Sequence, residues 1–170
     1  MKTTILLSAL SLTVSSFTVI PDFSGSTSTP SSQEMAKKML AAFQHSSQQE
    51  YTSLFPSLTE FHQFMVQQAN IYGEFLNDAK RDFAADYQKK TLPALAEAFD
   101  RIADEGKKKG IDWNSIQFVQ VEHEDIRDQQ FSMAGFSIVF KSNEKEYRLV
   151  LEKALVMNGQ WKVTQFIRLM

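Results

Sequence analysis

The sequence lacks several residues and patterns on which common functions depend. It contains no cysteine, which excludes disulfide bonds, thiolate chemistry and a lipid anchor attached to cysteine. It also lacks the glycine patterns of P-loop, dinucleotide-binding and GxSxG proteins. No HExxH motif and no cluster of carboxylates at metal spacing occurs, so we expect neither a metal nor a cofactor.

The sequence also has no surplus of basic residues. Lysine and arginine together number 18, aspartate and glutamate number 20, and the formal net charge is −2. Removal of a signal that contains Lys2 would make this charge more negative. Binding to the phosphate backbone depends on a basic surplus, so we expect no nucleic-acid partner.

A long hydrophobic run is missing as well. A membrane-spanning helix needs about 20 largely apolar residues, whereas the run at residues 5–14 is shorter and diluted by serine and threonine. Lys2 precedes this run and the small residues Ser15 and Ser16 follow it, which is the order of a secretory signal. We therefore predict a signal peptide over residues 1–20 and a secreted or periplasmic protein. Retention in the membrane is the alternative that we do not favour.

Residues 21–31 are dominated by serine, threonine, glycine and proline. Such a segment cannot bury enough apolar surface to offset the entropy of ordering, so we expect a flexible linker. Residues 32–170 then remain for one domain. A chain of that length buries about two-thirds of its unfolded surface and needs no disulfide or metal for stability.

The first half of this domain carries helical patterns. Ser31 and Ser57 are each followed three residues later by glutamate, which is the spacing of a capping box, and apolar residues then recur at helical spacing. We expect the first helix over residues 32–46. A second, shorter helix over residues 48–55 should end before Pro56, which lacks a backbone donor.

Helical spacing continues from Phe75 and changes phase near Pro93. This pattern predicts either two helices or one helix kinked at Pro93, with Thr91 as an N-cap. The three lysines at 107–109 fall where a helix would expose its last carbonyl groups, and Gly110 can adopt the left-handed cap. We favour this interpretation of the lysines over an anion-binding patch.

After Gly110 the apolar pattern changes from helical to alternating. Residues 116–121 alternate across a first strand, which we expect to end in the polar run 122–128. The apolar face of the next strand changes parity at Gly135, which predicts a β-bulge there. With the hairpin that follows, these strands make a four-stranded antiparallel meander.

The strongest local signal is the dipeptide Asn158-Gly159 between two apolar runs, because both residues tolerate the positive φ of a type I′ hairpin turn. A two-residue turn places Met157 opposite Gln160. Continuing that register makes the face that contains Trp161 the more apolar one, so we expect the helices to cover it.

The same register places Glu152 opposite Gln165, on a face that is otherwise apolar. A buried carboxylate needs partners or a solvated cavity, so the pair becomes a candidate ligand site together with Trp161, Tyr147 and Tyr87. The alternative is an error of one residue in the register, which would turn every side chain to the other face.

The element order resembles that of the NTF2-like and cystatin-like α+β folds. The resemblance covers residues 31–170 and rests on helices followed by a bulged sheet that ends in the hairpin at residues 156–166. It implies N-terminal helices packed on a curved four-stranded antiparallel meander sheet. It also implies that any pocket between the layers serves a small ligand, catalysis or only a filled core, and it allows a homodimer through the sheets. More helical segments precede the first strand here than in most members of that group.

No catalytic residue can be assigned from these patterns. His123 lies among acidic residues at an expected strand end, while His45 and His62 have no metal-spaced partner. We therefore expect an exported, non-enzymatic domain that binds a small molecule, a peptide or a partner protein. The alternatives are a small enzyme that uses Glu152 as general base, with Gln165 orienting the substrate, and an interaction module without a pocket.

Overall fold

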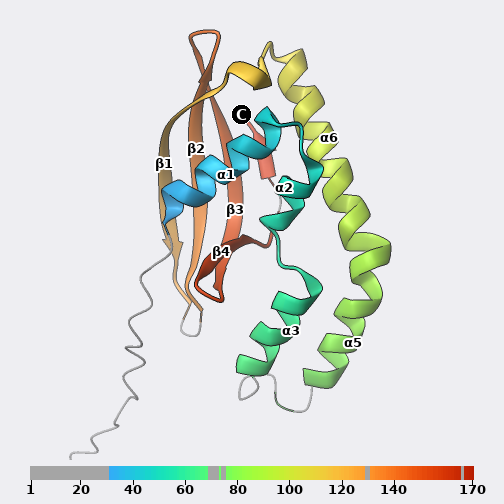
Figure 1. Cartoon of the computed structure of the whole chain (residues 1–170). Helices are drawn as coiled ribbons and strands as arrows, with labels where there is room; N and C mark the ends of the chain where they lie inside the picture. Colours follow the sequence, from blue (N-terminus) through green and yellow to red (C-terminus); the bar gives the residue numbers. More distant parts are fainter. Residues whose placement is uncertain (1–30, 69–72, 74–75, 129–130, 166) are drawn as a thin grey trace, which may run out of the picture.

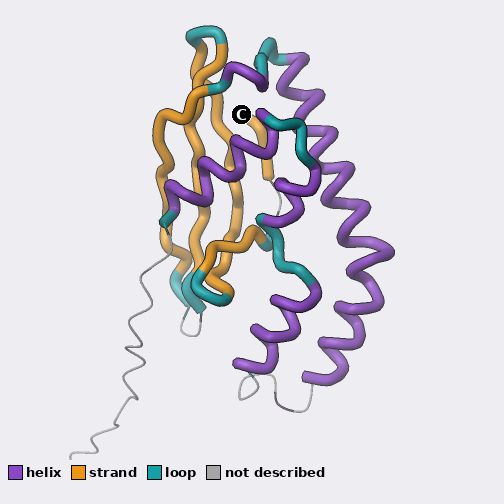
Figure 2. Tube along the Cα trace, in the orientation of Figure 1, coloured by secondary structure: helices purple, strands orange, loops and turns teal. Residues whose placement is uncertain are grey.

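The computed structural model describes residues 31–68, 73, 76–128, 131–165 and 167–170, and helices precede an antiparallel sheet in it (Figures 1 and 2). The helical elements are α1 (Ser32–Gln44), α2 (Gln48–Ser53), α3 (Leu58–Gln67), α5 (Leu76–Asp86), the π-helical turn η2 (Tyr87–Thr91), α6 (Leu92–Lys108) and the 3-10 turn η3 (Trp113–Ser115). The strands are β1 (Gln117–Ile126), β2 (Met133–Ser142), β3 (Lys145–Met157), β4 (Gln160–Val163) and β5 (Ile167–Leu169). The expected α+β class is confirmed. The expected signal peptide, and the expected linker except Ser31, lie outside the described residues.

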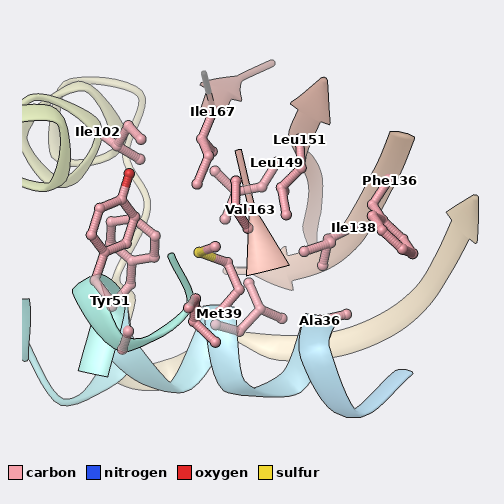
Figure 3. Packing of buried hydrophobic residues seen from close by; sticks show 14 of the residues in the cluster. Ala36, Met39, Tyr51, Ile102, Phe136, Ile138, Leu149, Leu151, Val163 and Ile167 are labelled. Carbon is pink, nitrogen blue, oxygen red and sulfur yellow. The ribbon is translucent and has the colours of Figure 1, made fainter. Parts of the chain in front are cut away.

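Helix α1 lies across the inner face of the sheet (Figure 1). It begins where expected, because the Ser31 hydroxyl accepts a hydrogen bond of 3.2 Å from the Glu34 amide. Its buried residues recur at helical spacing: Met35, Ala36, Met39, Leu40, Ala42 and Phe43. Of these, Ala36 and Met39 are seen to face the sheet in Figure 3. This apolar stripe fixes α1 on the sheet.

The capping box predicted at Ser57 is present in full. The Ser57 hydroxyl accepts from the Glu60 amide at 3.2 Å, and the Glu60 carboxylate accepts from the Ser57 amide at 2.9 Å. Helix α3 therefore starts with two of its free amides satisfied. Its buried residues Phe64 and Met65 lie in the position expected from their spacing.

Helices α5 and α6 form one continuous column that is interrupted by the π turn η2 (Figure 1). The Leu92 amide donates to the Tyr87 carbonyl, five residues earlier, instead of four. A proline ring crowds the carbonyl four residues before it, here that of Lys89, and the wider turn lies directly before Pro93. The kinked-helix alternative is thus the one observed. The expected N-cap at Thr91 is wrong, because Thr91 has helical angles and makes no capping bond.

The end of α6 matches the expectation from its lysines and glycine. Gly110 has φ +82°, and the Ile111 amide donates to the Gly106 carbonyl at 2.9 Å, as in a Schellman cap. Lys109 pairs with Glu105 at 3.2 Å and donates to the Leu169 carbonyl at 3.2 Å. This lysine is therefore used within the fold.

The sheet has the order β1-β2-β3-β4, and β5 also pairs with β3. The expected meander is present, with a fifth strand added where the last hairpin arm divides. The first strand ends within the polar run 122–128 as expected, because β1 stops at Ile126, which pairs with Met133. Since β1 is an edge strand, its charged residues 122–125 can remain exposed within the strand.

The predicted irregularity near Gly135 is present, but the extra residue belongs to β3. Ala134 pairs with Ala154, while Phe136 pairs with Leu151, so Glu152 and Lys153 together face Gly135. A side chain at Gly135 would meet the Glu152 carbonyl at 3.3 Å. The bulge changes the parity of β3 and turns Glu152 away from the core.

The turn at Asn158 and Gly159 is confirmed, with φ angles of 50° and 73° and Met157 opposite Gln160. The predicted register holds as far as Ala154 with Val163. Beyond it the predicted pairs of β3 with residues 166–168 are wrong, because Leu151 pairs with Ile167 and Leu149 with Leu169. The physical reason is the break between β4 and β5, which comes next to the bulge of β3 and shifts the pairing by one residue.

The main core lies between α1, α2, α6 and the inner face of the sheet (Figure 3). Ala154 and Val163 are fully buried there, which agrees with the expectation that the helices cover this face. Trp161 is half-buried and meets the Phe136 ring edge-on at 5.1 Å. The opposite face of the hairpin was expected to be more exposed, but Met157 is buried there in a second cluster beneath α3.

Candidate functional site

A cleft of about 690 Å³ lies between the helical column and the end of the sheet. One wall is η2 with the first half of α6, and the other is formed by the connection of α2 to α3 and the connection of β4 to β5. Most of its lining residues are apolar: Tyr51, Phe55, Pro56, Phe61, Phe83, Ala94, Leu95, Ala98, Met157, Val163 and Ile167. The polar ones are Lys90, Thr91, Glu97, Arg101, Thr164 and Gln165.

The α6 wall follows from helical periodicity. Thr91, Ala94, Leu95, Ala98 and Arg101 recur at intervals of three or four residues, so they share one face of the helix. The two alanines on this face leave space that larger side chains would fill. From Thr91 to Arg101 the helix rises about 15 Å, which gives the cleft an elongated wall.

Aromatic side chains form the end of the cleft near α3 and α5. The rings of Phe61 and Phe83 stack with centroids 3.7 Å apart and thereby join the two helices. Phe55 and Pro56 lie between α2 and α3 and continue this apolar surface. A ligand at this end would meet only apolar groups from these four residues.

Tyr51 is the most buried polar residue of the lining, with 1 % of its surface exposed. Its ring packs against Phe43, Phe55 and Phe99 at centroid distances of 5.7, 5.1 and 5.3 Å. Its hydroxyl points toward α6 near Ile102 (Figure 3) and makes no hydrogen bond with any residue that the structure describes. Burial raises the pKa of Tyr51 to about 12, so the hydroxyl stays a neutral donor.

Charged side chains stand along the α6 side of the cleft. Lys90 is paired with Asp86 at 2.8 Å. Arg101 makes no ion pair within the described part of the chain, and neither does Glu97. Lys90 is therefore neutralised by an ion pair, whereas Arg101 is not.

Of the five residues expected to form a ligand site, Gln165 alone lines this cleft. Glu152 is exposed and pairs with Arg168 at 2.9 Å, outside the cleft. Glu152 and Gln165 do not face each other, because the β3 bulge and the break before β5 separate them. The structure does not bring the proposed pair together.

The three aromatic candidates also lie outside the lining. Trp161 packs on the core from the edge of the sheet. Tyr147 donates its hydroxyl to the Lys109 carbonyl at 3.2 Å and stacks on Phe140. Tyr87 is buried at the start of η2, where its ring lies 5.5 Å from that of Phe83.

The sequence patterns gave no functional role to Tyr51 or to Arg101. The signal that was present is a tyrosine on the apolar face of a short helix, where its hydroxyl needs a partner. A second signal is the small-residue spacing of Ala94 and Ala98 after Pro93. Neither reveals a cleft without knowledge of how the helices pack.

Other candidate chemistry is sparse in the residues described. No three histidine, aspartate or glutamate side chains among them are placed to hold a metal ion. His45 lies 2.9 Å from Glu50, His123 lies 4.0 Å from Asp125, and both histidines are exposed. These pairs belong to the surface and not to the cleft.

Neither the length and polarity of the helices nor similarity to known proteins indicates a function. None of the helices in the described ranges is long and apolar enough to cross a membrane. No protein-family model matches the chain, and neither a curated protein nor a solved structure matches it. The chemistry of the cleft therefore has to be judged from its own residues.

Proposed function

We propose that this chain is an exported, non-enzymatic domain that binds a small, mainly apolar molecule. The cleft between α6 and the end of the sheet is the observation that carries this proposal. Its volume of about 690 Å³ lies within the range of about 300–1,000 Å³ that is typical of small-molecule sites. An apolar lining with a few polar groups is the usual composition of such sites.

The size of the cleft favours a small molecule over a protein partner. A stable protein interface buries about 800 Å² on each side, mostly over an open surface. Here the lining is contributed by opposed walls, with Phe61 and Phe83 at one end and Tyr51 set into the core. Concave walls of this kind suit a ligand that they can surround.

The arrangement gives less support to an enzyme. Glu152, the candidate general base, is held outside the cleft by Arg168. Glu97 is the single carboxylate in the lining of the cleft, and it is exposed on α6 without a partner that would orient it. A general base has to be a proton acceptor that is held close to the substrate. The described lining contains no carboxylate that is held in place in this way.

The proposal also includes export of the protein and membership of an NTF2-like or cystatin-like fold family. The order of residues 1–20 supports secretion into the periplasm or the medium. A helical layer on one face of an antiparallel sheet supports the resemblance to NTF2-like and cystatin-like folds. A pocket between such layers is where the resemblance implies a ligand.

The proposal is tested by blocking the cleft. The neutral dye phenylnaphthylamine should bind the purified protein saturably and gain fluorescence, because its apolar rings would leave water. Ala94→Trp should lower the affinity for the dye by about tenfold or more, since residue 94 lines the cleft and its larger side chain would occupy it.

Ala85→Trp is the matched control, because Ala85 is exposed on α5 outside the lining. It should leave dye binding unchanged, and both variants should keep the melting temperature of the parent protein. Absence of saturable binding to the parent, or equal binding by Ala94→Trp, would show that the cleft is not a binding site.

A further inference from the structure

We infer that the ligand of the cleft is an amphipathic anion, such as a single-chain carboxylic acid. Its charged group would bind Arg101 and accept a hydrogen bond from the Tyr51 hydroxyl, and its apolar chain would lie along α6 toward Phe61 and Phe83. This inference rests on the proposed function and adds the chemical class of the ligand.

Arg101 is the cationic group of the cleft that makes no ion pair within the described part of the chain. Three acidic side chains near it on α6 are engaged elsewhere: Asp104 lies 3.5 Å from Lys107, Glu105 lies 3.2 Å from Lys109, and Asp100 accepts from Gln48. The fourth, Glu97, makes no ion pair with Arg101. A guanidinium group has donors arranged to bind a carboxylate in two places at once. It is therefore free to bind an anion that enters the cleft.

The hydroxyl of Tyr51 supplies a second polar group in the cleft. It has no hydrogen-bond partner among the described residues, and Tyr51 belongs to the lining of the cleft. None of the described side chains has a nitrogen or oxygen atom that is both buried and unbonded, so the Tyr51 hydroxyl is accessible and can donate to a ligand. Burial raises the pKa of Tyr51, and the positive charge of Arg101, which lines the same cleft, acts against this increase.

The rest of the cleft suits an apolar chain and disfavours a second charged group. The α6 wall between Thr91 and Arg101 is about 15 Å long and carries Ala94 and Ala98 in its middle. Beyond it lie the stacked rings of Phe61 and Phe83. Lys90 at that end is already neutralised by Asp86, so the anion has its best site at the Arg101 end.

The negative charge of Glu97 is unfavourable for an anionic ligand, and this provides a sharper test of the inference. It lies in the lining one helical turn before Arg101, and its negative charge would repel an anion. If the ligand is an anion, Glu97→Gln should tighten binding. If the ligand is neutral, the same change should leave the affinity unaltered.

The experiment compares dodecanoate with dodecanol in calorimetric titrations of the mature protein. The two share the apolar chain and differ in charge. Dodecanoate should bind at least about tenfold more tightly, the difference expected for one charge-assisted contact. Arg101→Gln should remove that difference, Tyr51→Phe should reduce it several-fold, and Glu97→Gln should increase it. Arg168→Gln, which changes an exposed arginine outside the lining, is the matched control and should alter nothing.

The outcomes separate this inference from the proposed function. Equal affinities for dodecanoate and dodecanol would overturn the anion inference and leave the apolar cleft standing. Failure of both ligands and of the neutral dye would overturn both. Binding to phosphatidylglycerol vesicles without binding of dodecanoate would also contradict the inference, because it would identify a membrane surface in place of a single-chain acid.

Discussion

At the scale of single residues, Gly106 marks the closest approach between α6 and the segment that leads to β1. The Trp113 indole donates to the Ala103 carbonyl at 2.9 Å and its ring stacks on Phe43 and Phe140. A Cβ atom at residue 106 would lie 2.3 Å from the Trp113 ring. Only glycine permits this contact at its present distance.

Gly106→Ala should therefore destabilise the protein by about 2 to 3 kcal/mol, because the added methyl group overpacks the core against Trp113. Helix propensity alone predicts the opposite sign, a gain of about 1 kcal/mol for alanine over glycine. Urea denaturation of the two proteins decides between them. In a Trp113→Phe background, which removes the ring atoms in the clash, the same substitution should be neutral or stabilising. A loss of equal size in both backgrounds would refute the steric explanation.

The residues predicted correctly from the sequence are those whose conformation is locally determined. Asn158 and Gly110 needed only the preference of a residue type for positive φ, and both have it. Thr91 was assigned wrongly, because capping depends on whether the preceding helix stops, and here it continues through a π turn. The pairing of Glu152 with Gln165 failed for a related reason, since one bulged residue changes every later pair.

At the scale of elements, α3 is joined to the sheet by a partly buried ion pair. Lys162 in β4 lies 2.8 Å from the Glu60 carboxylate and donates to the Ser53 carbonyl at 2.9 Å. The Lys162 side chain is 8 % exposed and that of Glu60 is 29 % exposed. Desolvation alone would raise the pKa of Glu60, but hydrogen bonds from Lys162 and Ser57 outweigh it and lower the pKa below its usual value.

This asymmetry predicts which partner is more costly to remove. Glu60→Gln should destabilise the protein by about 3 kcal/mol, because it leaves the lysine charge buried without a counter-ion. Lys162→Met should be less destabilising, since Glu60 can still reach water and the methionine fills the same space. Thermal unfolding at neutral pH measures both, and the reverse order would contradict the role given to Lys162.

The same pair gives the sign of a pH effect. A carboxylate whose pKa is lower in the folded state stabilises the fold above its unfolded pKa, and this stabilisation is lost as pH falls through the lowered pKa. The difference in unfolding free energy between the parent protein and Glu60→Gln should therefore shrink in acid. A difference that stays constant across this range would show that Glu60 acts without its charge.

Elements with a strong periodic pattern were predictable, and their pairing was less so. The starts of α1 and α3 and the kinked column of α5 and α6 follow from caps, apolar spacing and one proline. The end of β1 within the polar run was also predictable, and an edge strand tolerates the charge there that an inner strand would not. The division of the last arm into β4 and β5 arises from pairing with a bulged neighbour, which is a tertiary effect.

At the scale of the whole molecule, the cleft results from a mismatch between the two layers. Helices α3 and α5 extend past the end of the sheet in Figure 1, and none of the described strands covers the side of the column that faces this end. The residues that line the cleft come from eight helical or strand elements and the loops between them. Sequence patterns identify which residues each element buries, but the space left between elements depends on their relative positions. This is why only Gln165, of the five residues expected to form a ligand site, lines the cleft.

The predicted export of the protein can be tested through cleavage of its signal sequence. If residues 1–20 are a secretory signal, expression of the full chain in a bacterium with periplasmic fractionation should give a mature form whose N-terminus lies near residue 17. A second form that starts at residue 31 should melt at the same temperature, because the main core begins with Met35 and the segment before it is poor in apolar residues. Intact mass spectrometry of the periplasmic fraction and thermal melts of both forms measure these expectations. An unprocessed protein retained in the cytoplasm would contradict export, and a large fall in melting temperature for the shorter form would mean that the preceding segment packs on the domain.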